Sequence, residues 1–158
     1  MRIAVITVSD SVSRGTREDR SGEALRSWCE EHEWQVVKSE VLADDQNAIR
    51  DLLIEICDSG AADIILTTGG TGLGPRDVTP EATAAAASRI VSGLGERMRE
   101  VGGRKFSRAY LSRAIAAVRG ATLIVNLPGS PKGAVDSVNA IAELLPHAVE
   151  VLGGAGHG

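Results

Sequence analysis

Three short apolar runs rich in β-branched residues, separated by segments with helical periodicity, constrain the fold more than any other feature. They occupy residues 2–8, 63–68 and 122–127. Runs that are this short and apolar on both faces are typical of buried parallel strands. A fourth run, residues 34–42, alternates more and predicts a partly exposed strand. Because parallel strands need crossover connections, helices are expected between them.

The segments between these runs carry the expected helical pattern. The apolar residues assigned to helix core faces are Ala24, Leu25, Trp28 and Cys29, then Ile49, Leu52, Leu53 and Ile56, then Val135, Val138, Ile141, Ala142 and Leu145. Helix starts are predicted where a hydroxyl N-cap precedes a proline, at Ser130 before Pro131 and at Thr79 before Pro80. We therefore predict an α/β fold, a three-layer α/β/α sandwich with a mostly parallel central sheet.

Length, charge and cysteine content narrow the range of functions. The 158 residues are expected to form a single domain over residues 1–152, followed by a flexible Gly-rich tail over residues 153–158. A net charge of -4 gives no basic footprint for nucleic acid. Without a signal segment or a run near the roughly 20 apolar residues of a membrane span, a cytoplasmic protein with no membrane partner is expected. Cys29 and Cys57 are interpreted as buried thiols.

Ligands of open parallel sheets bind beyond the carboxyl ends of the strands, which directs attention to three loops, residues 9–15, 67–77 and 126–133. The middle loop reads TTGGTGLGPRD. Its four glycines either bring bare backbone N–H groups against an anion or serve turns that need positive φ. It is not a Walker loop, because no Gly-Lys-Ser/Thr follows the glycines.

The other loops add a second anion site and carboxylates. Ser130 and Lys132 provide a helix cap with free N–H groups and an ammonium. Asp77 and the pair Asp44 and Asp45 provide carboxylates for Mg²⁺ bridging phosphates, although Asp45 also fits a helix N-cap. No Ser/His/Asp or Cys/His set is present, so the chemistry expected is phosphoryl or nucleotidyl transfer by positioning and charge neutralisation.

Together these motifs resemble the MogA/MoaB-type molybdopterin-binding family over nearly the whole chain. The most specific element is TTGGTG at residues 67–72, followed by PRDVTPE at residues 75–81. Supporting strings are VSD at residues 8–10, DDQ at residues 44–46 and NLPGSPK at residues 126–132. The string LGPRD at residues 73–77 is nearer the MoaB pattern than the MogA pattern.

The resemblance implies Mg²⁺-dependent adenylyl transfer from ATP to molybdopterin, which yields adenylylated molybdopterin and pyrophosphate in molybdenum cofactor biosynthesis. It gives Asp44 and Asp77 the catalytic and metal-binding roles. It also implies a homotrimer, with a hexamer as the larger alternative, and a downstream protein that inserts the metal. The residues implied to bind substrate are Ser9, Asp10, Thr68, Gly69, Gly70, Thr71, Gly72, Pro128, Gly129, Ser130 and Lys132.

Two other functions are compatible with the same residues. The first is a non-catalytic molybdopterin-binding or carrier protein that delivers the pterin without turning over ATP. The second is an unrelated nucleotide-binding enzyme, which would bind ATP tightly and show no affinity for the pterin. Release of pyrophosphate in the presence of ATP, Mg²⁺ and molybdopterin distinguishes transfer from carriage.

Overall fold

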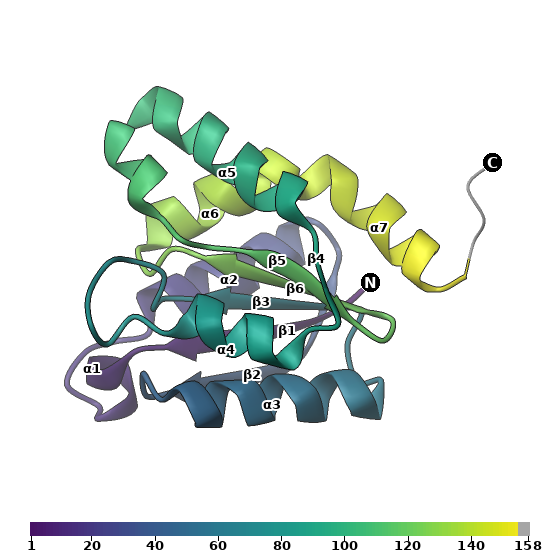
Figure 1. Ribbon diagram of the computed structural model, residues 1–158, viewed down its shortest axis with the longest axis horizontal. Coiled ribbons are helices and arrows are strands. Elements are labelled where there is room, and N and C mark those ends of the chain that lie inside the picture. The colour runs from purple at the N-terminus through teal and green to yellow at the C-terminus, as the bar shows by residue number, and fades with distance from the viewer. Residues whose placement is uncertain (155–158) are drawn as a thin grey trace.

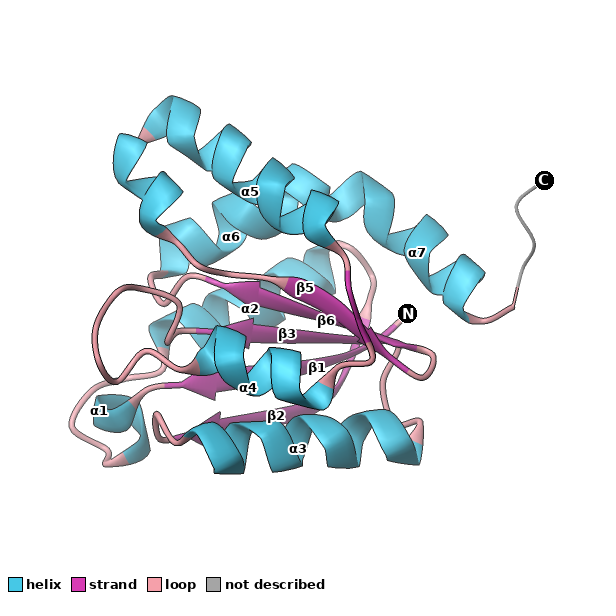
Figure 2. Ribbon diagram, in the orientation of Figure 1, coloured by secondary structure: helices cyan, strands magenta, loops and turns pink. Residues whose placement is uncertain are grey.

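The computed structural model describes residues 1–154, and a β-sheet lies at its centre (Figure 2). The sheet has six strands in the order β2-β1-β3-β6-β5-β4. Four adjacent strands are parallel: β2 (Gln35–Leu42), β1 (Arg2–Val8), β3 (Ile64–Thr68) and β6 (Thr122–Leu127). These are the four strands expected from the sequence. The alternating run forms the edge strand β2, whose residues alternate between exposed and half-buried.

Helices cover both faces of the sheet, so the predicted three-layer α/β/α sandwich is confirmed (Figure 1). On one face, α2 (Arg20–Glu31), α5 (Ser92–Lys105), α6 (Pro131–Ile141) and α7 (Leu145–Leu152) share a core with Ile3 and Val5. On the other, α3 (Gln46–Ser59) and α4 (Thr79–Ala86) share a core with Ala4 and Ile6. Successive β1 side chains thus enter opposite cores, as the two-residue period of a strand requires. The short elements are α1 (Asp10–Ser13), η1 (Ser107–Leu111) and η2 (Ala142–Leu144).

Two antiparallel strands were not anticipated from the sequence. β5 (Ala116–Arg119) pairs with β6, and the two-residue β4 (Arg89–Ile90) pairs with β5. Both are too short to show a clear period, and β5 reads AAVR, in which alanine favours helix over strand. The mostly parallel sheet therefore ends in an antiparallel edge.

Most of the helix boundaries follow the sequence, but two expectations were wrong. The pattern read as one helix from Val135 to Leu145 breaks after Ile141, because Pro146 has no N–H to continue the ladder and the chain restarts as α7. Thr79 is not an N-cap: α4 is capped by Val78 without a side-chain hydrogen bond. Ser130 caps α6 as predicted, by accepting from the N–H of Gly133.

The remaining expectations concern the ends, the cysteines and the membrane. Gly153 and Gly154 form a turn after α7, and residues 155–158 of the expected tail lie outside the described residues. Cys29 and Cys57 are buried free thiols, as predicted, and burial raises the pKa of each to about 11. Across residues 1–154, every helix is too short or too polar to cross a bilayer.

Candidate active site

The loops after β1, β3 and β6 meet at one edge of the sheet, because these strands are adjacent and parallel (Figure 1). The N–H of Gly69 donates to the carbonyl of Leu127 at 3.0 Å, and the Thr68 hydroxyl donates to the carbonyl of Pro128 at 2.6 Å. A Cβ placed on Gly129 would lie 3.3 Å from the Cα of Gly69. The glycine loop and the PGSPK loop are therefore packed against each other, and a side chain at Gly129 would crowd the glycine loop.

The glycine loop, residues 69–74, presents a row of unused backbone donors. Over the described chain, no acceptor is found for the N–H groups of Gly70, Thr71, Gly72 and Leu73. Gly69 and Gly70 have φ values of +102° and +69°, which side chains other than glycine rarely adopt. The turn interpretation of the glycines is therefore confirmed, and the free N–H groups are the donors that the anion interpretation requires.

Thr79 closes the base of the glycine loop. Its hydroxyl, which is fully buried, donates to the carbonyl of Gly69 at 2.9 Å, and its N–H donates to the carbonyl of Gly70 at 3.1 Å. The hydroxyl that the sequence assigned to a helix cap instead ties the loop to the first turn of α4. The loop is thus held to the helix that follows it by two hydrogen bonds.

Asp77 folds back over the same loop. One carboxylate oxygen accepts from the N–H of Gly74 at 2.9 Å, and the N–H of Asp77 donates to the carbonyl of Gly74 at 3.0 Å. A Cβ on Gly72 or on Gly74 would lie 2.9 Å from that carboxylate oxygen. The two glycines therefore leave the space that the Asp77 carboxylate occupies.

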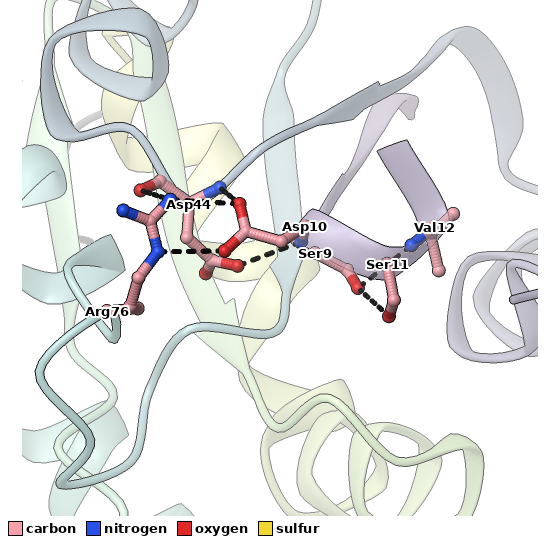
Figure 3. A network of polar contacts seen from close by, with 6 residues as sticks. All are labelled: Ser9, Asp10, Ser11, Val12, Asp44 and Arg76. Atoms are coloured by element: carbon pink, nitrogen blue, oxygen red, sulfur yellow. Dashed lines mark hydrogen bonds and ion pairs between the residues drawn. The ribbon is translucent and has the colours of Figure 1, made fainter. Parts of the chain in front are cut away.

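Asp10, Asp44 and Arg76 form a second polar network beside the loop (Figure 3). The carboxylate of each aspartate accepts from the backbone N–H of the other, both at 3.0 Å. Arg76 donates to both carboxylate oxygens of Asp10, at 2.8 and 3.0 Å, and to the carbonyl of Asp44 at 3.2 Å. In the same view, the Ser9 hydroxyl accepts from the N–H of Val12 and caps α1.

The two carboxylates of this network have opposite pKa shifts. The hydrogen bonds from Arg76 hold the pKa of Asp10 below its ordinary value. Burial raises the pKa of Asp44, and the nearby negative charges of Asp10 and Asp77 add to that rise. Asp44 and Asp77 are therefore close enough to repel each other, and a bound cation would relieve that repulsion.

Two connected hollows lie over these residues. A cavity of about 180 Å³ is lined by Ser9, Arg17, Asp44, Gly70 and Asp77, among others. A wider groove of about 610 Å³ runs from there across Thr71 and Leu73 to Arg108 of η1 and Ser130 at the start of α6. Gly70 and two carboxylate residues thus line one cavity, and the rest of the donor row and a helix N-terminus line the groove that extends from it.

The sequence pattern of the family described as "Probable molybdopterin binding domain" matches residues 4–147. This chain belongs to that family. It is the MogA/MoaB family of molybdenum cofactor biosynthesis, as the motifs predicted.

Relatives of this molybdopterin-binding chain align over most of its length. It is 36% identical over 154 residues to the molybdopterin adenylyltransferase of Helicobacter pylori strain J99, covering 96% of this chain and 88% of that protein. The same identity holds over 145 residues with the molybdopterin adenylyltransferase of Escherichia coli K12, covering 90% and 74%. The crystal structure of the molybdopterin biosynthesis enzyme MoaB from Thermus thermophilus superposes with a TM-score of 0.91 at 47% identity, covering 97% and 96%.

The structure brings together most of the residues that the family resemblance implied. Those that line the cavity or the groove are Ser9, Asp44, Thr68, Gly69, Gly70, Thr71, Gly72, Asp77, Pro128, Gly129 and Ser130. Asp10 lies behind Asp44 and is engaged by Arg76. Lys132 lines neither hollow, and its ammonium pairs with Asp136 one turn further along α6, at 3.1 Å. Asp45 is the N-cap of α3, the structural role considered for it from the sequence.

Three arginines at this site were not assigned to it from the sequence. Arg17 lines the cavity and Arg108 lines the groove. Arg113 binds the carbonyls of Gly72 and Asp77, both at 2.8 Å. Arg17 lies two residues after the loop that follows β1, and this position at a strand end could have predicted it from the sequence. Arg113 precedes β5, a strand that the sequence did not reveal, so no local signal placed it beside the glycine loop.

The donor set of this family member fits a metal shared with a substrate. Among residues 1–154, no three His, Cys, Asp or Glu side chains gather closely enough to hold an ion by themselves. Mg²⁺ keeps several waters and is bound by one or two carboxylates together with substrate phosphates. Asp44 and Asp77, which face the same cavity, match that requirement.

Arg76→Gln is expected to raise the pKa of Asp10 and, by less, that of Asp44. The guanidinium lowers both pKa values, chiefly through its hydrogen bonds to Asp10. Each carboxyl in the variant would then become protonated at a higher pH. Carboxyl carbon shifts followed by NMR across an acid titration measure both values. Arg50→Gln, which removes a pair with Asp51 on α3, is the control that leaves both unchanged. An unaltered Asp10 titration in Arg76→Gln would contradict the network.

Proposed function

We propose that this protein transfers the adenylyl group of ATP to molybdopterin, giving adenylylated molybdopterin and pyrophosphate. The observation that carries the proposal is the placement of Asp44 and Asp77 at one cavity beside the row of free N–H groups at residues 70–73, which begins at Gly70 on the cavity wall and continues along the groove. That combination suits a polyphosphate, which needs backbone donors for its oxygens and carboxylates for its counter-ion. The two adenylyltransferase relatives at 36% identity support the reaction type.

In the proposed reaction, a phosphate oxygen of molybdopterin forms a bond to the α-phosphorus of ATP, and the bond from that phosphorus to the β-phosphate bridging oxygen breaks. Pyrophosphate leaves with the electron pair, so no protein nucleophile is needed. Mg²⁺ held by Asp44 and Asp77 would supply positive charge to the leaving pyrophosphate. The chain's own contribution is positioning and electrostatic stabilisation.

Each part of the site has a share in that positioning. The N–H groups of Gly70 to Leu73 bind one set of phosphate oxygens, and the capped N-terminus of α6 at Ser130 offers donors to a second. Arg17 on the cavity wall adds positive charge. Lys132 reaches an anion in the groove only after leaving Asp136, so we assign it a weaker role than the family resemblance gave it.

Assembly as a closed homotrimer, or a dimer of trimers, belongs to the same proposal. Several large apolar side chains are exposed on the isolated chain near the groove: Leu73, Phe106, Tyr110 and Leu111. Burying them in a symmetric contact would remove apolar surface from water.

The test is incubation of the protein with ATP, Mg²⁺ and molybdopterin, followed by assay of pyrophosphate and of the adenylylated pterin. The proposal requires both products in equal amounts, and neither when molybdopterin is left out. If molybdopterin binds but no pyrophosphate appears, the protein is a carrier and the catalytic proposal fails. If ATP binds tightly and molybdopterin does not, the ligand assignment fails.

Asp44→Asn is expected to slow adenylyl transfer at least about tenfold, while molybdopterin still binds. An asparagine oxygen can accept the N–H of Asp10 as the carboxylate does at 3.0 Å, so the fold is retained while one charge facing the cavity is lost. Single-turnover assays and binding of molybdopterin by fluorescence provide the two readouts. A variant that unfolds, with its folded fraction working at the parent rate, would show that Asp44 has only a structural role.

A further inference from the structure

We propose that Arg113 is a positioning residue for adenylyl transfer, which acts by fixing the Asp77 turn and the row of free N–H groups in the glycine loop. The inference rests on the function proposed above. Arg113 lies between η1 and β5 and touches the loop from the side of α4. It contributes no group to the cavity itself, so its effect is exerted through the loop.

Arg113 binds the loop at three carbonyls. Its backbone N–H donates to Thr71, its Nε to Gly72 and one terminal nitrogen to Asp77, each at 2.8 Å. The three acceptors span the segment that contains the free donors and the Asp77 turn. Because the hydroxyl of Thr79 holds only the base of the loop, at Gly69, Arg113 is what fixes the remainder against α4.

These contacts also determine where the free donors point. The described peptide bonds are all trans, so the C=O and N–H of one peptide unit point in opposite directions. With the carbonyls of Thr71 and Gly72 directed at Arg113, the N–H groups of Gly72 and Leu73 are directed away from it. Arg113 thus orients donors that it does not touch.

Glu81 holds the guanidinium in place for this task. It accepts from both terminal nitrogens of Arg113, at 2.6 and 3.1 Å, in the two-point geometry that a guanidinium forms with a carboxylate. Glu81 lies in the first turn of α4, so the pair joins the loop to the start of that helix. The Glu81 carboxylate also neutralises the charge of the Arg113 guanidinium. Arg113 is therefore assigned to holding the loop and not to binding a substrate anion.

A matched comparison exists at the opposite end of the sheet. Arg119 makes the same kind of set, two hydrogen bonds to the carboxylate of Asp58 at 2.9 and 3.1 Å and one to the carbonyl of Ala86 at 2.9 Å. It borders neither the cavity nor the groove. Replacing Arg119 therefore removes a similar number of contacts without touching the glycine loop.

The test compares Arg113→Lys with Arg119→Lys. Lysine keeps the charge but cannot bridge two carbonyls and a carboxylate at once. Hydrogen exchange of the free protein is expected to be about tenfold faster at Gly74 and Asp77, whose N–H groups are hydrogen-bonded within the turn, in Arg113→Lys, and unchanged there in Arg119→Lys. In the adenylyl transfer assay, kcat is expected to fall about 30-fold in Arg113→Lys and less than about twofold in Arg119→Lys.

A double variant separates positioning from a direct role. If Arg113 acts through Asp77, Arg113→Lys should lower kcat by less than about fivefold when Asp77 is already Asn. A second full 30-fold loss, or loop exchange equal to that of the parent, would overturn the proposal. Should Arg113→Lys fail to fold, Glu81→Gln, which weakens the two-point pair, must accelerate loop exchange for the proposal to stand. If the parent protein releases no pyrophosphate, the proposed function is wrong. The hydrogen-exchange measurement would still show whether Arg113 fixes the glycine loop.

Discussion

Asp77→Asn is expected to lower the rate of adenylyl transfer about 100-fold or more, which corresponds to about 2.7 kcal/mol of transition-state stabilisation. The oxygen of an asparagine can accept the N–H of Gly74 as the carboxylate does at 2.9 Å, so the turn is kept. What is lost is one of the two negative charges that face the cavity. Molybdopterin binding should be retained or become tighter, since a charge that repels its phosphate is removed.

The measurement is single-turnover transfer at limiting Mg²⁺, with thermal unfolding to verify the fold. Asp45→Asn is the matched control, because asparagine caps a helix as well as aspartate and the charge removed lies next to Asp44. A titration supplies a second readout: without the charge of Asp77, the raised pKa of Asp44 should fall, so Asp44 stays ionised to lower pH. Transfer at the parent rate in Asp77→Asn would rule out a catalytic role for this carboxylate and favour the carrier function.

Gly69→Ala is expected to lower the free energy of unfolding by about 3 kcal/mol or more, the largest stability effect of any single methyl group at this site. Gly69 has a φ of +102°, and a Cβ there would lie 2.2 Å from the carbonyl oxygen of Val8. Neither problem is relieved by rotating a side chain, because the obstructing atom belongs to the backbone of β1. The substitution must push β1 and the glycine loop apart, which also widens the cavity between them.

Urea unfolding of Gly69→Ala and Gly120→Ala separates the two causes. Gly120 also has a positive φ, +59°, but a Cβ there meets nothing within 4 Å. Its substitution should cost only the backbone strain, about 1 kcal/mol. Equal stabilities for the two variants would show that the close approach of Gly69 to Val8 carries no energetic weight.

The sequence was a reliable guide wherever a signal is local. Apolar runs placed the four parallel strands within about a residue, and the helical periods placed the core faces of α2 and α3. The glycine loop and the two aspartates were found because loops after parallel strands meet at one edge, which requires no knowledge of individual contacts. Ser130 was correctly predicted as a helix cap, because capping depends only on neighbours in the chain.

Sequence patterns were a poor guide where the hydrogen-bond partner of a residue was not the one that its local pattern suggests, and where a strand is very short. Thr79 satisfies a cap pattern, yet its hydroxyl goes to a carbonyl ten residues earlier because the loop folds back on α4. The ammonium of Lys132 pairs with Asp136 on the next turn of α6, a contact that its position after a helix cap did not indicate. β4 and β5 are strands because β6 is beside them, a neighbour that two to four residues cannot specify.

The sequence by itself determined the layers, the parallel strands, the edge at which the site forms and the family of the chain. Two contacts were decided only by the tertiary structure. Arg76 pairs with Asp10, 66 residues away in the sequence, and Arg113 binds the carbonyl of Gly72, 41 residues away. Periodicity and capping record interactions between residues within a few positions of one another, and these recur in any chain that forms the element. A guanidinium instead selects among carboxylates and carbonyls by their distance in space, which exists only after the sheet has brought the loops together.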